Sequence, residues 1–202
     1  MSADRPGPRP ATARIPRCPP SERGYDVAQV DDFLAAVQAA LRNSRSGAGA
    51  EPGGAAVLST EVRGAAFSGA RGGYRPAAVD ELLEAAEESL AAAEREQCLR
   101  ERGPEAWQEH LDALTRLLRN RLDRPRTQRF RRPSRPRAPG YSAAHVDVLC
   151  ERLRDRLEGT APLEPRELRR AVFPLVHGER SYEEHQVDAF LDRAVQLLLA
   201  SR

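Results

Sequence analysis

Tyrosine and aspartate side chains recur together at one fixed spacing, and both kinds of side chain can take part in catalysis or ligand binding. Each of the four tyrosines is followed, at the fifth position, by a Val-Asp pair. An aspartate can act as a general base, and a tyrosine ring can stack on a ligand. The aspartates have no recurring catalytic partner, so we expect them to face solvent or a neighbouring backbone while the rings cover an apolar stripe. Motifs 1 to 4 are Tyr25 with Val30-Asp31, Tyr74 with Val79-Asp80, Tyr141 with Val146-Asp147, and Tyr182 with Val187-Asp188.

Other catalytic and metal-binding patterns are missing from the sequence. The four histidines show no paired ligand spacing with each other or with the three cysteines. The cysteines are odd in number and far apart, which favours a reducing compartment over a disulfide framework. There is no Gly-rich phosphate loop and no nucleophile with a base at helical spacing. We predict a protein that is not an enzyme and has no cofactor or metal.

The residues that follow each valine predict one amphipathic helix per motif. Apolar or small side chains recur at offsets of three, four, seven and eleven, which lie on one stripe of an α-helix. Glycine precedes three of the tyrosines and favours a tight turn there. This agreement predicts four copies of one unit. The predicted seam and interaction residues are Tyr25, Val30, Phe33, Leu34, Tyr74, Val79, Leu82, Leu83, Tyr141, Val146, Leu149, Tyr182, Val187, Phe190 and Leu191.

The first motif carries a family resemblance. The stretch RGYDVAQVDDFL, from Arg23 to Leu34, resembles the opening motif of the DivIVA family of membrane-curvature and cell-division scaffolds. Motif 4 is similar over Tyr182 to Leu191, and motifs 2 and 3 share less of the pattern. The resemblance implies a helical scaffold that pairs with itself, as an oligomer, or with DivIVA-type scaffolds, and that is enriched at the septum or the poles.

The resemblance also implies where a membrane contact would lie. Family members that insert into membranes can expose an aromatic residue just before the Gly-Tyr pair. The positions three before each tyrosine are Glu22, Arg71, Ala138 and Glu179, and none is aromatic. We therefore expect protein–protein packing more than membrane insertion through these tips.

The composition predicts small hydrophobic cores and a cytoplasmic location. Only 40% of the 202 residues are hydrophobic and mean hydropathy is -0.61, so the chain can build one or two small domains. The longest apolar run falls short of the roughly 20 residues that a membrane-spanning helix needs. The first 20 residues lack the apolar stretch of a secretory signal.

These patterns predict an all-α chain of short amphipathic helices in four tandem DivIVA-like repeats, with one extra helical hairpin and disordered Pro/Arg-rich linkers. Residues 1–20 should be a disordered lead-in and residues 44–56 a flexible linker. An apolar stripe predicts the extra helix at 103–123, paired with the helix before it. The seams are too short for independent coiled coils, so we expect adjacent repeats to pack on each other. The predicted repeats are 21–43, 57–102 with a long helix, 138–160 and 161–202.

An arginine-rich segment leaves a second functional class open. From Arg119 to Arg137 the chain has nine arginines and one acid, and prolines should end any helix after about Arg124, leaving a linker at 124–137. Such a segment can dock on anionic lipid head groups or neutralise nucleic-acid phosphates, or it can be a solvated linker that binds nothing. Phe130 is its only aromatic residue, which gives little support for base stacking. The candidate contact residues are Arg126, Arg129, Arg131 and Arg132.

Overall fold

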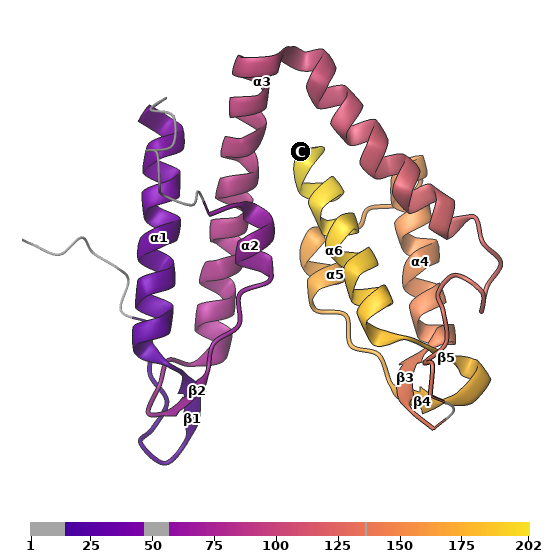
Figure 1. The fold of residues 1–202 in the computed structure, drawn as a ribbon, viewed down its shortest axis with the longest axis horizontal. Helices are drawn as coiled ribbons and strands as arrows, with labels where there is room; N and C mark the ends of the chain where they lie inside the picture. Colours follow the sequence, from indigo (N-terminus) through magenta and orange to yellow (C-terminus); the bar gives the residue numbers. More distant parts are fainter. Residues whose placement is uncertain (1–14, 47–56, 136) are drawn as a thin grey trace, which may run out of the picture. The chain divides into compact units, whose positions relative to one another are not determined.

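The computed structural model describes residues 15–46, 57–135 and 137–202. Most of the predicted lead-in and most of the first linker lie outside these residues. The described chain is mostly helical, as predicted, but it also contains two small β-sheets that the all-α prediction missed (Figure 1). The helices are α1 (Val27–Ser46), α2 (Ser59–Arg63), α3 (Pro76–Leu122), α4 (Ala143–Glu158), α5 (Pro165–Arg169) and α6 (Glu184–Ala200), with a 3-10 turn at Gly178–Arg180.

Two compact units share the chain. Unit 1 comprises the described parts of Met1–Val57 together with Glu61–Glu87, and unit 2 comprises Leu58–Thr60 and Glu88–Arg202. Motifs 1 and 2 fall in unit 1, and motifs 3 and 4 fall in unit 2. Helix α3 contributes its beginning to unit 1 and the remainder to unit 2.

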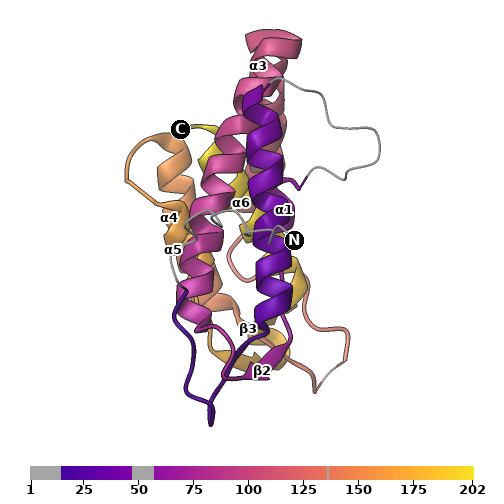
Figure 2. The same ribbon diagram turned by 90° about the vertical axis from the view of Figure 1, so that its left-hand side faces the viewer.

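In unit 1, α1 and the beginning of α3 run side by side (Figures 1 and 2). Strand β1 (Arg23–Tyr25) pairs antiparallel with β2 (Gly69–Arg71), and next to this pair Tyr25 and Tyr74 exchange backbone N–H···O bonds of 2.9 Å each. A Cβ on Gly24 would lie 2.2 Å from the Tyr74 carbonyl oxygen, so only glycine allows this approach. Val30 and Val79, which open the two apolar stripes, are fully buried.

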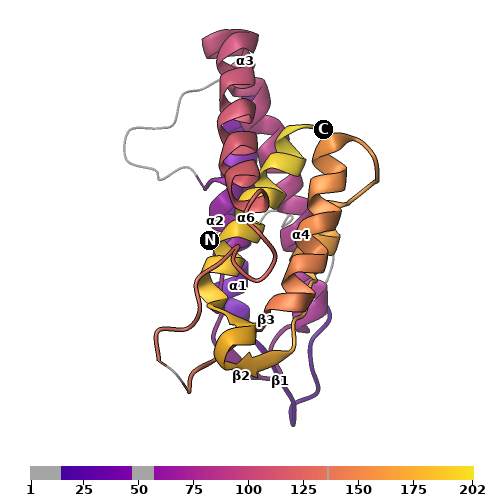
Figure 3. The same cartoon turned by 90° about the vertical axis from the view of Figure 1, so that its right-hand side faces the viewer.

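In unit 2, α4 and α6 lie beside each other above a three-stranded sheet (Figures 1 and 3). The strands are β3 (Pro139–Ser142), β4 (Leu175–His177) and β5 (Ser181–Tyr182), in the order β4-β3-β5. Both pairings are antiparallel, and Tyr141 is in register with Tyr182. The core is shared by α4, α6 and α5, and its buried residues include Val146, Leu153, Leu168, Val187 and Leu198. Unit 2 therefore pairs motifs 3 and 4 as unit 1 pairs motifs 1 and 2.

Helix α3 consists of two helical stretches that meet at a break. Gly103 interrupts the helical backbone with φ 85 and ψ 171, and Pro104 follows it, as the sequence predicted. The second stretch runs to Leu122, where the sequence predicted an extra helix. The part after the break, residues 104–122, is called the C-terminal arm of α3. It packs Leu114, Leu118 and Leu122 into the unit 2 core, so its stripe is covered by α4 and α6 residues.

The arginine-rich segment is not a disordered linker. Residues 124–135 contain no helix or strand, which agrees with the prolines, but they pack on unit 2. The Phe130 ring is buried, with its centroid 5.1 Å from that of Tyr182 and 5.2 Å from that of Phe190. Burial of the Phe130 ring therefore holds this segment against unit 2, although its many arginines predicted a solvated linker.

Candidate functional site

The four motifs meet in pairs through their tyrosine and aspartate side chains. In unit 2, the Tyr182 hydroxyl donates to Asp147 Oδ1 at 3.1 Å, and Asp188 lies close enough to Tyr141 to add to the rise that burial causes in the pKa of its hydroxyl. Each pairing joins the tyrosine of one motif to the aspartate of the other. The exchange is reciprocal because the sheet places the two motifs in opposite directions.

The same exchange occurs in unit 1. The Tyr74 hydroxyl donates to Asp31 Oδ1 at 3.0 Å, and Asp80 lies close enough to Tyr25 to add to the rise that burial causes in the pKa of its hydroxyl. Each aspartate is therefore paired with the tyrosine of the partner motif. As expected, Asp31, Asp80 and Asp188 are exposed to solvent. Asp147 is only 3% exposed, and it accepts from the Thr127 backbone N–H as well as from Tyr182.

Burial keeps these phenols in the donor form. It raises the pKa of the Tyr182 hydroxyl far above its ordinary value, and the negative charge of Asp147 adds to that shift. Burial is also the largest cause of the raised pKa of Tyr25, Tyr74 and Tyr141. A phenol that stays protonated can hold a carboxylate over the whole physiological pH range.

Arg129 joins the unit 2 pair to a buried ion network. Its side chain is 2% exposed, its Nη1 lies 3.5 Å from Asp147 Oδ1, and its Nη2 bonds Glu151. Its backbone N–H donates to the Tyr182 hydroxyl at 3.2 Å. The hydrogen bond from Arg129 is the largest cause of the lowered pKa of Glu151. Arg129 was a predicted anionic-surface contact, and its burial makes it unavailable for that role.

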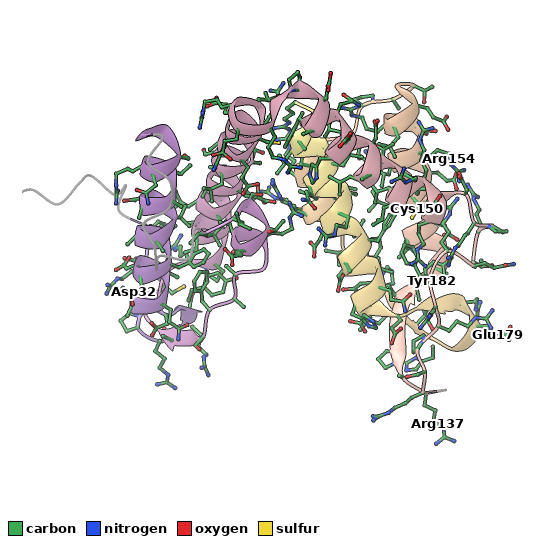
Figure 4. The ribbon with its side chains drawn as sticks, turned by 45° about the horizontal axis from the view of Figure 1, so that its top comes forward. Asp32, Arg137, Cys150, Arg154, Glu179 and Tyr182 are labelled. Atoms are coloured by element: carbon green, nitrogen blue, oxygen red, sulfur yellow. The ribbon has the colours of Figure 1, made fainter. Side chains whose placement is uncertain are left out.

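The other predicted arginines lie at the surface. Arg126 is exposed, with its Nε 3.6 Å from Glu151 Oε1, and Arg132 is exposed, with its Nη1 3.4 Å from Glu179 Oε1. Arg131 is exposed as well. Glu179 and Arg137 project away from unit 2, whereas Cys150 and Tyr182 lie inside it (Figure 4). The four candidates thus divide into one buried structural residue and three surface residues.

The predicted seam residues are mostly covered. One exception is Leu82, which is 36% exposed and lies outside the core. The buried members are Val30, Val79, Val146, Leu149, Tyr182, Val187 and Phe190. The half-buried members are Tyr25, Phe33, Leu34, Tyr74, Leu83, Tyr141 and Leu191.

The network of Arg129 with Asp147 and Glu151 was missed from the sequence. The spacing of Asp147 and Glu151, four apart on α4, places two acids on one helix face and could have signalled a basic partner. Apart from the adjacent Phe130, nothing in the local sequence distinguishes Arg129 from the neighbouring arginines, because its burial depends on distant contacts with Asp147, Glu151 and Tyr182.

Across residues 15–46, 57–135 and 137–202, no group of three His, Cys, Asp or Glu side chains is placed to hold a metal ion. In the same ranges, no helix combines the length and apolar character needed to cross a bilayer. The chain matches no protein-family model, no curated protein and no solved structure.

Proposed function

We propose that this protein is a non-enzymatic interaction scaffold of four DivIVA-like repeats, packed within one chain as two pairs. It acts through protein partners, either a second copy or a DivIVA-type scaffold, in cell division or polar growth. The observation that carries the proposal is the reciprocal tyrosine–aspartate exchange, which occurs between motifs 1 and 2 and again between motifs 3 and 4.

Two pairs with one geometry support an internal repeat. Each pair brings a Gly-Tyr backbone against its partner so closely that a Cβ would collide with a tyrosine carbonyl: 2.2 Å at Gly24 and 2.3 Å at Gly140. In each pair, both valines that begin the apolar stripes of the two helices are buried. Because the motifs contact each other within the chain, the outer helix faces and the turns are left to contact partner proteins.

The turns themselves favour protein contacts over membrane insertion. Glu22, Arg71 and Glu179 are exposed at the positions where a membrane-inserting member would carry an aromatic side chain. A charged tip would have to be desolvated to enter the bilayer, at a cost of several kcal/mol.

Surface arginines favour a second candidate, binding of an anionic membrane surface or nucleic acid. Arg126, Arg131 and Arg132 are exposed on one segment and could contact phosphates. Burial of Arg129 and Phe130 weakens this candidate, because it removes one positive charge and the only aromatic platform of the segment.

The proposal is tested by localisation of a fluorescent fusion in the native host. Signal concentrated at septa or poles is expected, and a uniform cytoplasmic signal contradicts the proposal. Val187→Asp, which places a charge in the unit 2 core, should abolish the localisation and the recovery of partner scaffolds in a pulldown. Val172→Asp is the matched control, because Val172 is 90% exposed outside the helices of unit 2 and the same charge there should be tolerated.

A further inference from the structure

A groove runs along one side of unit 2, between the C-terminal arm of α3 and α6. Its volume is about 620 Å³, and Arg124 and Arg131 of the segment that follows α3 also line it. On α3, Leu117 and Arg121 are four residues apart and so lie on one helix face, and on α6 Ala189 and Arg193 do the same. The two rims of the groove thus come from two helices that share one core.

The rim is strongly basic. Arg121, Arg124, Arg131 and Arg193 line the groove together with His185, and none of the ten lining residues is acidic. Burial lowers the pKa of Arg121, and the positive charges of Arg124 and Arg131 lower it further. These charges repel one another across the groove, so a bound anion would relieve the repulsion.

The groove also has an apolar part. Leu117 is 50% exposed, whereas Leu114, Leu118 and Leu122 on the same arm are buried, and Ala189 is exposed on α6. A guanidinium pairs a carboxylate through two parallel hydrogen bonds, and an exposed leucine favours an aliphatic side chain. A groove with basic rims and an apolar centre is complementary to an acidic peptide segment that contains an aliphatic residue.

We infer that this groove binds a short acidic segment of a partner protein, with carboxylates at the arginines and an aliphatic side chain over Leu117. The inference rests on the proposed function, since it supplies the chemistry of a protein partner. Nucleic acid fits the groove less well, because the nearby rings of Phe130 and Phe190 are buried and cannot stack on bases. A lipid surface fits less well because the basic residues line a concavity that flat head groups do not enter.

The test uses the full chain and a short fluorescein-labelled peptide that alternates Glu and Leu, followed by fluorescence anisotropy. The same peptide with Gln in place of Glu is the charge-free probe. Binding of the acidic peptide that weakens with added salt is expected, with little binding of the Gln peptide. Equal affinity for both peptides, or no binding of either, overturns the inference.

Variants locate the binding. The triple change Arg124→Gln, Arg131→Gln and Arg193→Gln should weaken binding roughly tenfold or more, because three guanidinium groups lose their carboxylates. Arg132→Gln is the matched control: it is exposed next to Arg131 but outside the groove lining, and affinity should stay within about twofold. All three residues of the triple change are exposed, so the fold should persist, as circular dichroism can verify.

Two outcomes separate this inference from its alternatives. Tighter retention on single-stranded DNA or anionic vesicles than on the peptide, lost in the same triple variant, overturns it in favour of a polyanion surface. If the peptide does not bind but the protein still localises to septa or poles, the inference about the groove is overturned and the proposed cellular role is not. Uniform localisation with intact peptide binding contradicts the proposed cellular role and leaves the groove supported.

Discussion

The Tyr182 hydroxyl lies 3.1 Å from Asp147 Oδ1 and donates a hydrogen bond to it, although 35 positions separate the two residues in the sequence. Asp147 also accepts from the Thr127 backbone N–H at 2.7 Å. These two hydrogen bonds to Asp147 therefore connect α4 to the strand at the start of the fourth motif and to the arginine-rich segment. In unit 1 the corresponding bond joins Tyr74 to Asp31 at the surface. The same relationship occurs in two environments, which allows its energy to be compared.

Removal of the buried hydroxyl should destabilise unit 2. Tyr182→Phe takes a donor from a buried carboxylate, so we expect a loss of about 1 to 3 kcal/mol in the free energy of unfolding, measured by urea denaturation. Tyr74→Phe is the matched control, because water can replace the donor at exposed Asp31, and its effect should be smaller. Equal losses in the two variants would show that burial does not set the strength of the bond.

Loss of the buried guanidinium should cost more. Arg129→Gln leaves Asp147 and Glu151 without their shared cation, and breaking a buried ion pair typically costs about 3 to 5 kcal/mol. Arg132→Gln removes an exposed ion pair with Glu179 and should change stability by roughly 0 to 1 kcal/mol. Urea denaturation of the two variants gives the comparison, and similar values would contradict the structural role of Arg129.

Acidification should weaken unit 2 through Glu151. The pKa of Glu151 in the folded protein lies below its ordinary 4.5, chiefly because Arg129 hydrogen-bonds the carboxylate. A carboxylate with a lowered pKa contributes stability above its unfolded pKa and loses that contribution as pH falls through the folded value. Urea midpoints below about pH 5 should therefore fall more steeply for the native chain than for Glu151→Gln. Parallel pH profiles for the two proteins would exclude this linkage.

A methyl group at Gly140 should disrupt the sheet of unit 2. Its Cβ would lie 2.3 Å from the Tyr182 carbonyl oxygen, so β3 and β5 must separate. We expect Gly140→Ala to cost about 1 to 3 kcal/mol or more in thermal or urea unfolding. Gly69→Ala is the control: the nearest atom to its Cβ is the Arg23 Nε at 3.3 Å, on a flexible side chain. A larger effect at Gly69 would contradict the assigned packing.

Cys150 should be the least reactive thiol of the described chain. Burial is the main cause that raises its pKa to about 12, and the thiolate is the reactive form. Iodoacetamide at mildly alkaline pH should modify half-buried Cys98 faster than Cys150, as mass spectrometry of the peptides can show. Urea should remove the difference. Equal rates in the native protein would mean that α4 opens readily.

Local features of the fold were readable from the sequence. The spacing of apolar residues predicted helices after each tyrosine, and Gly103-Pro104 predicted the break in α3, because periodicity and backbone freedom act over a few residues. The end of α3 at Leu122 similarly follows from the prolines just beyond it.

Long-range partners were decided by the tertiary structure. Strands of two to four residues, such as β5 and β3, have no signal of their own and exist because another strand satisfies their backbone. The acceptor role of the aspartates depends on bonds that span 35 and 43 positions. By itself the sequence determined that a helix follows each tyrosine and Gly103, and which side of each of these helices is apolar. Only packing decided that Arg129 is buried, because its neighbours there come from α4 and β5, far along the chain.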